Sequence, residues 1–372
     1  MKIIEYKSCD KGKGEWDFSK IVLGKVNLLV GNSGTGKTRF LNTLFNLGYS
    51  AVNNQIKKRG FWEITFTINN KNYEWVFETE KLDDEKLVVA IDSLKEVLKN
   101  GEDRVIVERN RDTFKFFEED LPKLSKNVSS ICLLKEEEEI APIHKGFSSI
   151  LRRNFWDAEL QKNFAISSFP QKIFDNIIKK RDIEAIFTND LPVNYKLLFL
   201  SKTNRNKYNK VIEMYREIFP SIKSFEIKHT FMFMGNPAPV TYVKEKNVRK
   251  EIPIHQLSSG MQKVLLLLVD MIILPNGGIF LIDEYENSLG INSINFLPTM
   301  LSTFDNDNQF IITSHHPYLI NNIPVKDWQI FHRKGSKVTI KPGKDYEEKF
   351  GKSKQQHFLQ LLNDPFYNEG IE

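Results

Sequence analysis

Cysteine is scarce in this sequence, with only Cys9 and Cys132 among 372 residues. A small secreted domain held together by disulfides needs more cysteines, and a zinc site needs them closer together. The sequence therefore excludes a disulfide framework and gives no sign of a zinc-binding module. We expect the protein to act in a reduced, cytoplasmic compartment.

Long hydrophobic runs are also missing. The longest, near 264–269 and 279–282, are far shorter than the ~20 residues needed to cross a bilayer. The first residues, Met1–Glu5, contain too few apolar side chains for a signal peptide. We expect no membrane span, although such a chain could still be the soluble motor of a membrane transporter.

Sustained heptads, internal repeats and low-complexity tails are absent as well, which argues against a long coiled coil or a solenoid. What remains is an ordinary globular composition, with 41% hydrophobic and 27% charged residues. A chain of 372 residues is long enough for one large α/β domain or two smaller ones.

Positive charge is concentrated in the middle of the chain. The net charge is +5, yet residues 146–250 hold 19 Lys and Arg against 10 Asp and Glu, so the remainder is slightly negative. Such a segment can bind nucleic acid or another anionic partner. It can equally be the solvated face of exposed helices, and the sequence leaves both interpretations open. The candidate contacts cluster at 179–181 and 202–210.

One motif carries more information than the rest of the chain. The residues Gly31, Asn32, Ser33, Gly34, Thr35, Gly36, Lys37 and Thr38 match the pattern G-x-x-x-x-G-K-[ST] at every required position. An apolar segment at 26–30 precedes it and a helical pattern at 39–45 follows it, which is the context of a phosphate-binding loop. Lys37 would reach the β- and γ-phosphates, and Thr38 would coordinate Mg²⁺. We expect the chain to bind a nucleoside triphosphate.

Three later segments complete a nucleotide site. Leu257–Lys263 opens a helix, and its Ser259 and Gly260 form an anion-binding turn. Asp283 and Glu284 follow the apolar strand 279–282, at the end of a strand where α/β sheets carry their chemistry. Asp283 would hold Mg²⁺ and Glu284 would polarise the attacking water. His315 follows the strand 309–314 and would sense the γ-phosphate or the water by a hydrogen bond.

Local patterns predict further elements. In the first part of the chain we expect two strands within 1–30 around a polar turn, a hairpin from 61–69 and 72–79, a strand and a short helix in 86–101, and a pair of strands in 103–117. A buried strand at 129–134 and an exposed acidic loop at 136–139 should follow. We expect helices over 150–219, and then strands at 224–229, 231–234 and 240–243.

These motifs together resemble those of the ABC-type ATPase superfamily. Gly31–Thr38 resembles Walker A, Leu257–Lys263 the signature motif, Ile279–Glu284 Walker B, and His315 the switch histidine. More narrowly, the stretches 283–289 and 313–319 are similar to the stand-alone "AAA family" ATPases related to RecF, SMC heads and OLD nucleases, many of which belong to bacterial anti-phage systems. The resemblance covers residues 1–50 and 250–320 well.

The resemblance implies an α/β fold, an ABC-type two-lobed P-loop ATPase head with an antiparallel β subdomain and a helical insertion. The whole chain would be one ATPase domain. Residues 1–149 would carry Walker A and the β subdomain, 150–220 the helical insertion, and 221–372 the signature, Walker B and the switch histidine. No Q-loop glutamine is evident, and the region where it would lie is near 131–140. Trp16 or Phe18 would either stack on adenine or pack in the core.

The implied activity is ATP hydrolysis, with ATP and Mg²⁺ bound between two copies of the chain. Ser259 and Gly260 of one copy would close over the γ-phosphate held by the other, so that ATP joins a homodimer and hydrolysis releases it. Fifty-six residues follow His316, and they hold no dense carboxylate cluster, so we expect a separate effector such as a nuclease or toxin. An anti-phage regulator is the leading hypothesis. A RecF- or SMC-like DNA-repair ATPase and a nucleotide-dependent scaffold with negligible turnover are the alternatives.

Overall fold

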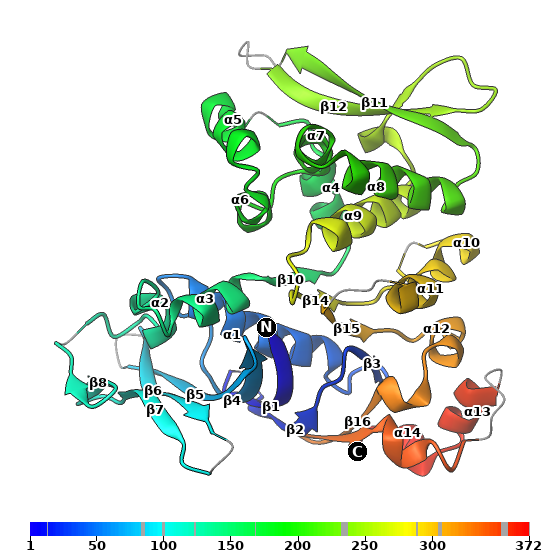
Figure 1. The fold of residues 1–372 in the computed structure, drawn as a ribbon. Helices are drawn as coiled ribbons and strands as arrows, with labels where there is room; N and C mark the ends of the chain where they lie inside the picture. The colour runs from blue at the N-terminus through cyan, green and yellow to red at the C-terminus, as the bar shows by residue number, and fades with distance from the viewer. Residues whose placement is uncertain are drawn as a thin grey trace. The chain divides into compact units, whose positions relative to one another are not determined.

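The structure is a computed structural model (Figure 1). It describes residues 1–12, 14–82, 86–98, 101–122, 124–167, 169–231, 237–287, 289–303, 307–350 and 356–371. The chain divides into two compact units. The first unit consists of Met1–Arg153, Asn276–Glu284 and Asp305–Glu372, and the second of Asn154–Pro275 and Tyr285–Phe304.

The first unit is built on one large sheet, which has fourteen strands within the described residues. In spatial order the strands are β10 (Ile150–Arg153), β14 (Ile279–Ile282), β15 (Gln309–Thr313), β3 (Val26–Val30), β16 (Trp328–Lys334), β17 (Lys337–Pro342), β2 (Trp16–Val22), β1 (Lys2–Asp10), β4 (Gly60–Ile68), β5 (Lys71–Lys81), β6 (Leu87–Val97), β7 (Arg104–Arg109), β8 (Phe114–Phe116) and β9 (Glu119–Asp120).

The first five strands of this order run parallel to one another. The three inner strands β14, β15 and β3 are almost continuously apolar, as expected for parallel strands covered on both faces. Because parallel strands end at the same edge of a sheet, the residues that follow β10, β14, β15 and β3 come together there. This edge carries the candidate site.

The other end of the sheet is antiparallel, from β2 to β9. Buried and partly exposed residues alternate along β4 and β5, which form the expected hairpin. Its turn residues Asn69 and Asn70 have φ values of 50° and 63°, which Asn tolerates better than most residues. The antiparallel strands continue the main sheet, rather than forming a separate layer beside it.

Helices and short turns complete the first unit. They are α1 (Lys37–Val52), α2 (Ser130–Leu133), α3 (Ala141–Ser148), α12 (Pro317–Asn322), η2 (Val325–Asp327), η3 (Gly343–Tyr346), α13 (His357–Leu362) and α14 (Pro365–Asn368). The core lies between α1 and the sheet, where Phe40, Leu44 and Trp62 are almost completely buried. The pairs β1–β2 and β7–β8, and the exposed acidic turn at 136–139, match the expectations from sequence.

Three expectations for this unit are wrong. The segment 129–134 is buried but helical, because the Ser129 hydroxyl accepts a hydrogen bond from Cys132 N and caps α2; a short apolar run does not distinguish a strand from a helix. The segment 86–101 has no helix in its described part, because β6 pairs with β5 along its whole length. Residues 150–153 form a strand, β10, rather than the start of a helical region.

The second unit is mainly helical. It contains α4 (Asp157–Phe164), α5 (Gln171–Lys180), α6 (Ile183–Thr188), α7 (Val193–Thr203), α8 (Arg205–Ile218), α9 (Ser259–Ile273), α10 (Ile291–Ile294), α11 (Phe296–Thr303) and η1 (Ile254–Gln256). A small antiparallel sheet holds β11 (Ile222–Phe231), β12 (Pro237–Glu245) and β13 (Ile252–Pro253). The expected strands at 224–229 and 240–243 lie in β11 and β12. Of the expected strand 231–234, only Phe231 falls within the described residues, at the end of β11.

The signature helix α9 packs against α8, α7 and α4 (Figure 1). A buried ion pair joins two of these helices, with Lys196 Nζ in α7 lying 2.7 Å from Asp270 Oδ1 in α9. None of the helices in the described residues is long and apolar enough to cross a membrane.

Candidate functional site

The phosphate-binding loop lies between β3 and α1, as the sequence predicts. Gly36 precedes the helix with a φ of 100°, a conformation that favours glycine. A Cβ atom there would also lie only 2.6 Å from the Trp16 ring, so the position has no room for a side chain. Lys37 is buried, and its Nζ atom donates to Gly31 O at 2.6 Å and to Asn32 O at 2.9 Å. Backbone carbonyl groups of the loop therefore accept hydrogen bonds from the ammonium of the loop's own lysine.

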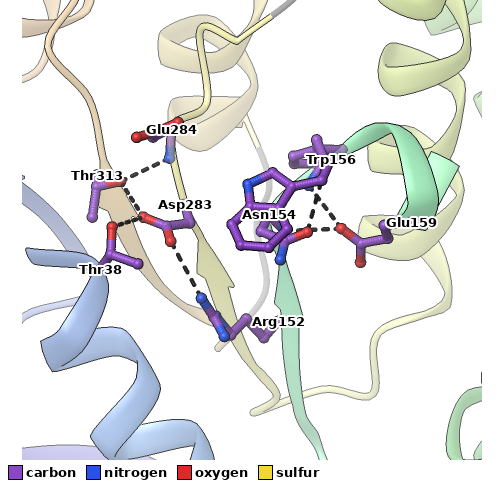
Figure 2. Close-up of polar contacts among 9 residues, drawn as sticks. Thr38, Arg152, Asn154, Trp156, Glu159, Asp283, Glu284 and Thr313 are labelled. Atoms are coloured by element: carbon purple, nitrogen blue, oxygen red, sulfur yellow. Dashed lines mark hydrogen bonds and ion pairs between the residues drawn. The ribbon is translucent and has the colours of Figure 1, made fainter. Parts of the chain in front are cut away.

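Asp283 connects the ends of three strands with the start of α1 (Figure 2). Its Oδ1 atom accepts hydrogen bonds from the hydroxyls of Thr38, at 3.0 Å, and Thr313, at 2.8 Å. Its Oδ2 atom lies 3.2 Å from Nη2 of Arg152 at the end of β10. The sequence motifs predict the proximity of Thr38 and Asp283. They do not predict Arg152.

Glu284 follows directly and has the left-handed φ of 48°, which is uncommon for a residue with a side chain. Its backbone N–H donates to the Thr313 hydroxyl at 2.7 Å, which holds the strained turn in place (Figure 2). The Glu284 side chain is exposed, whereas that of Asp283 is buried. The turn therefore directs adjacent carboxylates to different environments, a buried one that can bind a cation and an accessible one that can reach water.

A cavity of about 750 Å³ brings these residues together at the edge of the sheet. Lys37, Thr38, Glu284, Thr313 and His315 line it. It also contains several cationic side chains outside the motifs, namely those of Arg39, Lys57, Lys58, Arg152 and Arg333. The charge of this lining suits a polyanion such as a triphosphate.

Trp16 lines this cavity and lies close to two guanidinium groups. The Cζ atoms of Arg39 and Arg333 are 4.6 Å and 4.7 Å from the ring centroid. Such positions are typical of cation–π contacts. Phe18, by contrast, is completely buried against Phe40, so core packing is its role.

The oxygen atoms around Asp283 fit a magnesium ion. Mg²⁺ prefers hard oxygen ligands and is usually held by one or two carboxylates together with substrate phosphates. Asp283 and Thr38 provide a carboxylate and a hydroxyl within hydrogen-bond distance of each other, at the amino end of α1. No cluster of three or more His, Cys, Asp or Glu side chains that could bind a metal alone occurs in the described residues.

A segment near the end of the chain supports the phosphate-binding loop, and sequence reasoning missed it. The Asn32 side-chain amide donates to Tyr367 O at 3.1 Å. Arg333 donates from its backbone to Gly370 O at 2.9 Å and from its side chain to Gly34 O at 3.0 Å. No local motif reveals this contact, because it depends on more than 300 residues of intervening chain.

The signature residues belong to the second unit. Ser258 caps α9 by accepting a hydrogen bond from Met261 N at 3.4 Å, and Ser259 is exposed. Gln262 Nε2 donates to the carbonyl oxygens of Ile254 and His255, which fixes the turn before the helix. The helix begins at Ser259, inside the segment 257–263 that was expected to lead into a helix at 264–273, so Ser259 and Gly260 lie in its first turn.

The structure thus brings together Gly31–Thr38, Asp283, Glu284 and His315 in the first unit, and it adds Arg152 and Thr313. The region 131–140, where the Q-loop was expected, forms α2 and an exposed turn.

The strand that ends beside Asp283 is β10, which follows this region in the chain.

Comparison with protein families finds a match to a family described as "AAA domain, putative AbiEii toxin, Type IV TA system", over residues 26–321. The chain belongs to this AAA family. The match extends from β3 into α12, and so includes the phosphate-binding loop, Asp283, Glu284 and His315. This AAA protein has no significant match among curated protein sequences.

Solved structures show where the fold of this AAA protein occurs. An SMC head bound to the C-terminal winged-helix domain of ScpA matches with a TM-score of 0.50 and 13% identity, covering 92% of this chain and 98% of that one. The SMC head from Pyrococcus furiosus also matches, with a TM-score of 0.49 and 11% identity, covering 91% of this chain and 96% of that one. The SMC head from Thermotoga maritima matches with a TM-score of 0.40 and 14% identity, covering 92% of this chain and 99% of that one. The match at a TM-score of 0.50 shows that the AAA protein has the α/β fold of an SMC head.

Proposed function

We propose that the protein binds and hydrolyses ATP, and that it uses this reaction as a switch. The observation that carries the proposal is the single cavity in which Lys37, Thr38, Glu284 and His315 meet. Each of these side chains has a chemical part in phosphoryl transfer to water. The family and the fold support a nucleotide-dependent ATPase.

In this proposal the phosphate-binding loop holds the triphosphate. The Lys37 ammonium, which now donates to Gly31 O and Asn32 O, turns to the β- and γ-phosphates. Thr38 and Asp283 hold Mg²⁺, which would neutralise charge on the same phosphates. Because α1 begins at Lys37, its amino end adds unpaired N–H groups to the anion site.

The exposed carboxylate of Glu284 then orients the attacking water and accepts its proton. His315 donates a hydrogen bond to the γ-phosphate or to this water. The strained backbone of Glu284, held by Thr313, keeps the carboxylate in place before the nucleotide arrives.

We further propose that two copies of the chain close on ATP. Ser259 is exposed in the first turn of α9, and Gly260 follows it without a side chain. An exposed helix start of this kind can donate hydrogen bonds to the γ-phosphate bound by a second copy. Hydrolysis would then depend on assembly, as a switch requires. The nucleotide would hold the homodimer together.

The output of the switch is proposed to be a separate effector, a nuclease or toxin, in a cytoplasmic anti-phage system. The family description, which names a toxin and a toxin–antitoxin system, supports this setting. A trigger made of nucleic acid would fit the basic segment 146–250.

The test measures phosphate release from ATP and Mg²⁺ by the purified protein, with Glu284→Gln as the inactive control. Phosphate release by the parent but not by Glu284→Gln, together with ATP-dependent dimers, supports the proposal. Dimers that form with ATP but release no phosphate would indicate a scaffold instead. Strong stimulation by DNA, without any phage protection in cells that express the chain with its genomic neighbours, would favour a repair ATPase.

A further inference from the structure

We propose that Arg152 is a movable cation of the nucleotide site. Without nucleotide it neutralises Asp283, and when ATP binds it leaves Asp283 to the metal and contacts the γ-phosphate. This inference rests on the proposed ATPase function. It adds a positioning residue that none of the sequence motifs contains.

The strand pairing places Arg152 at the site. β10 runs parallel to β14, with Arg152 opposite Leu281 and Arg153 opposite Ile282. The backbone N–H of Asp283 donates to Arg153 O at 2.9 Å, which continues this pairing beyond the end of β14. Arg152 is therefore attached to the same rigid sheet edge as Asp283, and its long side chain is the part that can move.

The contacts of Asp283 place Arg152 on the carboxylate that would hold the metal ion. Oδ1 already accepts from Thr38 and Thr313, and Oδ2 pairs with Arg152 (Figure 2). A guanidinium against Oδ2 repels a metal ion that approaches the same carboxylate, because both groups are positive, so the two compete for Asp283. The pair is also longer, at 3.2 Å, than a strong charged hydrogen bond of about 2.7–2.9 Å.

The arginine is also only partly satisfied. Its side chain is 17% exposed, and its buried Nε atom has no hydrogen-bond partner among the described residues. A buried donor without an acceptor is unfavourable, and guanidinium groups bind phosphate through paired N–H donors. Arg152 lines the cavity together with Lys37 and Glu284. A γ-phosphate placed between the lysine and the carboxylate would supply the missing acceptor.

The first experiment removes the nucleotide and uses Mn²⁺ alone as the probe, measured by electron paramagnetic resonance. Arg152→Gln should bind Mn²⁺ at least about ten-fold more tightly than the parent, because a charged hydrogen bond no longer competes for Asp283. Adding Asp283→Asn to this variant should remove the gain. Lys58→Gln, which removes a positive charge from the same cavity, is the matched control and should change little.

The competition is overturned if Arg152→Gln binds Mn²⁺ like the parent, or if the gain survives Asp283→Asn. Because Arg152→Gln leaves the buried Asp283 uncompensated, the variant is expected to melt at a lower temperature. Mn²⁺ should restore most of this loss in the variant and raise the melting temperature of the parent less at the same concentration, so a weakened fold still gives a reading. Absence of this metal-specific rescue would also count against the proposal.

The second experiment compares the binding of ATP and ADP in the presence of Mg²⁺, with Glu284→Gln in both the parent and the Arg152→Gln protein so that ATP is not hydrolysed. Arg152→Gln should lower the affinity for ATP about ten-fold more than that for ADP, since the lost contact is to the γ-phosphate. Equal losses for both nucleotides would overturn the transfer to the γ-phosphate. If the parent binds neither nucleotide, the ATPase function fails and the transfer fails with it, whereas the Mn²⁺ result still decides the Arg152–Asp283 competition.

Discussion

The ammonium of Lys37 lies 2.6 Å from the carbonyl oxygen of Gly31, the first residue of the same phosphate-binding loop. A second carbonyl, that of Asn32, lies 2.9 Å away. The charge of this buried side chain is thus compensated by the loop itself, in the position that a phosphate would take over. The loop is ready for an anion before one binds, and its lysine only has to exchange one set of oxygen acceptors for another.

Replacing Lys37 by Ala should remove ATP binding almost completely. The variant lacks the charge that neutralises the β- and γ-phosphates, so we expect affinity to fall by about a hundred-fold or more. Isothermal titration with ATP measures the change. Circular dichroism serves as the control for folding, and unchanged affinity in a folded variant would refute the phosphate-loop assignment.

Replacing Glu284 by Gln should leave ATP binding intact and stop turnover. The amide keeps the shape of the side chain but cannot accept the proton of the attacking water, which predicts a loss of about 100- to 10,000-fold in the rate of phosphate release. Light scattering with saturating ATP should show dimers that persist, because they are not released by hydrolysis. Turnover at the parental rate would assign the base to another residue, and a monomer under these conditions would contradict the shared site.

Much of this site could be predicted because its residues are contiguous in sequence. Lys37 and Thr38 lie in one loop, and Asp283 and Glu284 follow one apolar strand, so local patterns suffice. Their convergence follows from the parallel pairing of β14, β15 and β3. The motifs therefore predicted the phosphate-binding part of the site, and the family that they resemble implied the fold class.

Arg152 could not be predicted in the same way. The strand that carries it, β10, is only four residues long and contains two arginines, so it has no local strand signal. Its conformation is imposed by pairing with β14, which lies more than a hundred residues later. The same reason applies to the contact of Asn32 with Tyr367. The error at 129–134 is of another kind. The burial of this segment was predicted correctly, but it forms a helix rather than a strand because Ser129 caps it.

The signature turn allows a test of the shared site through Gly260. Changing Gly260 to Arg should preserve ATP binding, because the residue belongs to the turn offered to a second copy. It should abolish hydrolysis in the homodimer. A mixture of this variant with Lys37→Ala forms some dimers in which one site carries both defects and the other carries none, so part of the activity should return.

The control for the mixture is evidence that mixed dimers form, for example by purification through a tag on one variant. If such dimers stay inactive at every ratio, either the two sites must act together or the shared site is wrong. The ATP-dependent dimerisation of Glu284→Gln separates these explanations. If Glu284→Gln stays strictly monomeric with ATP, the shared site is wrong.

The buried pair of Lys196 and Asp270 provides a prediction about stability. Both side chains are almost completely buried, and their charged atoms lie 2.7 Å apart. Changing Asp270 to Asn alone should lower the free energy of unfolding of the second unit by about 3–5 kcal/mol, because it leaves the Lys196 ammonium without its main countercharge. Urea unfolding followed by far-ultraviolet circular dichroism measures this loss.

Replacing both partners, Lys196 by Met and Asp270 by Leu, should recover most of the stability that either single change loses. Two apolar side chains of similar volume need no countercharge, and buried ion pairs are often no more stabilising than such replacements. If the double variant is as unstable as the sum of the single variants, the two residues are not coupled, and their separate contacts hold α7 and α9. ATP binding at the first unit should be unchanged in the double variant, since neither residue lines the nucleotide cavity.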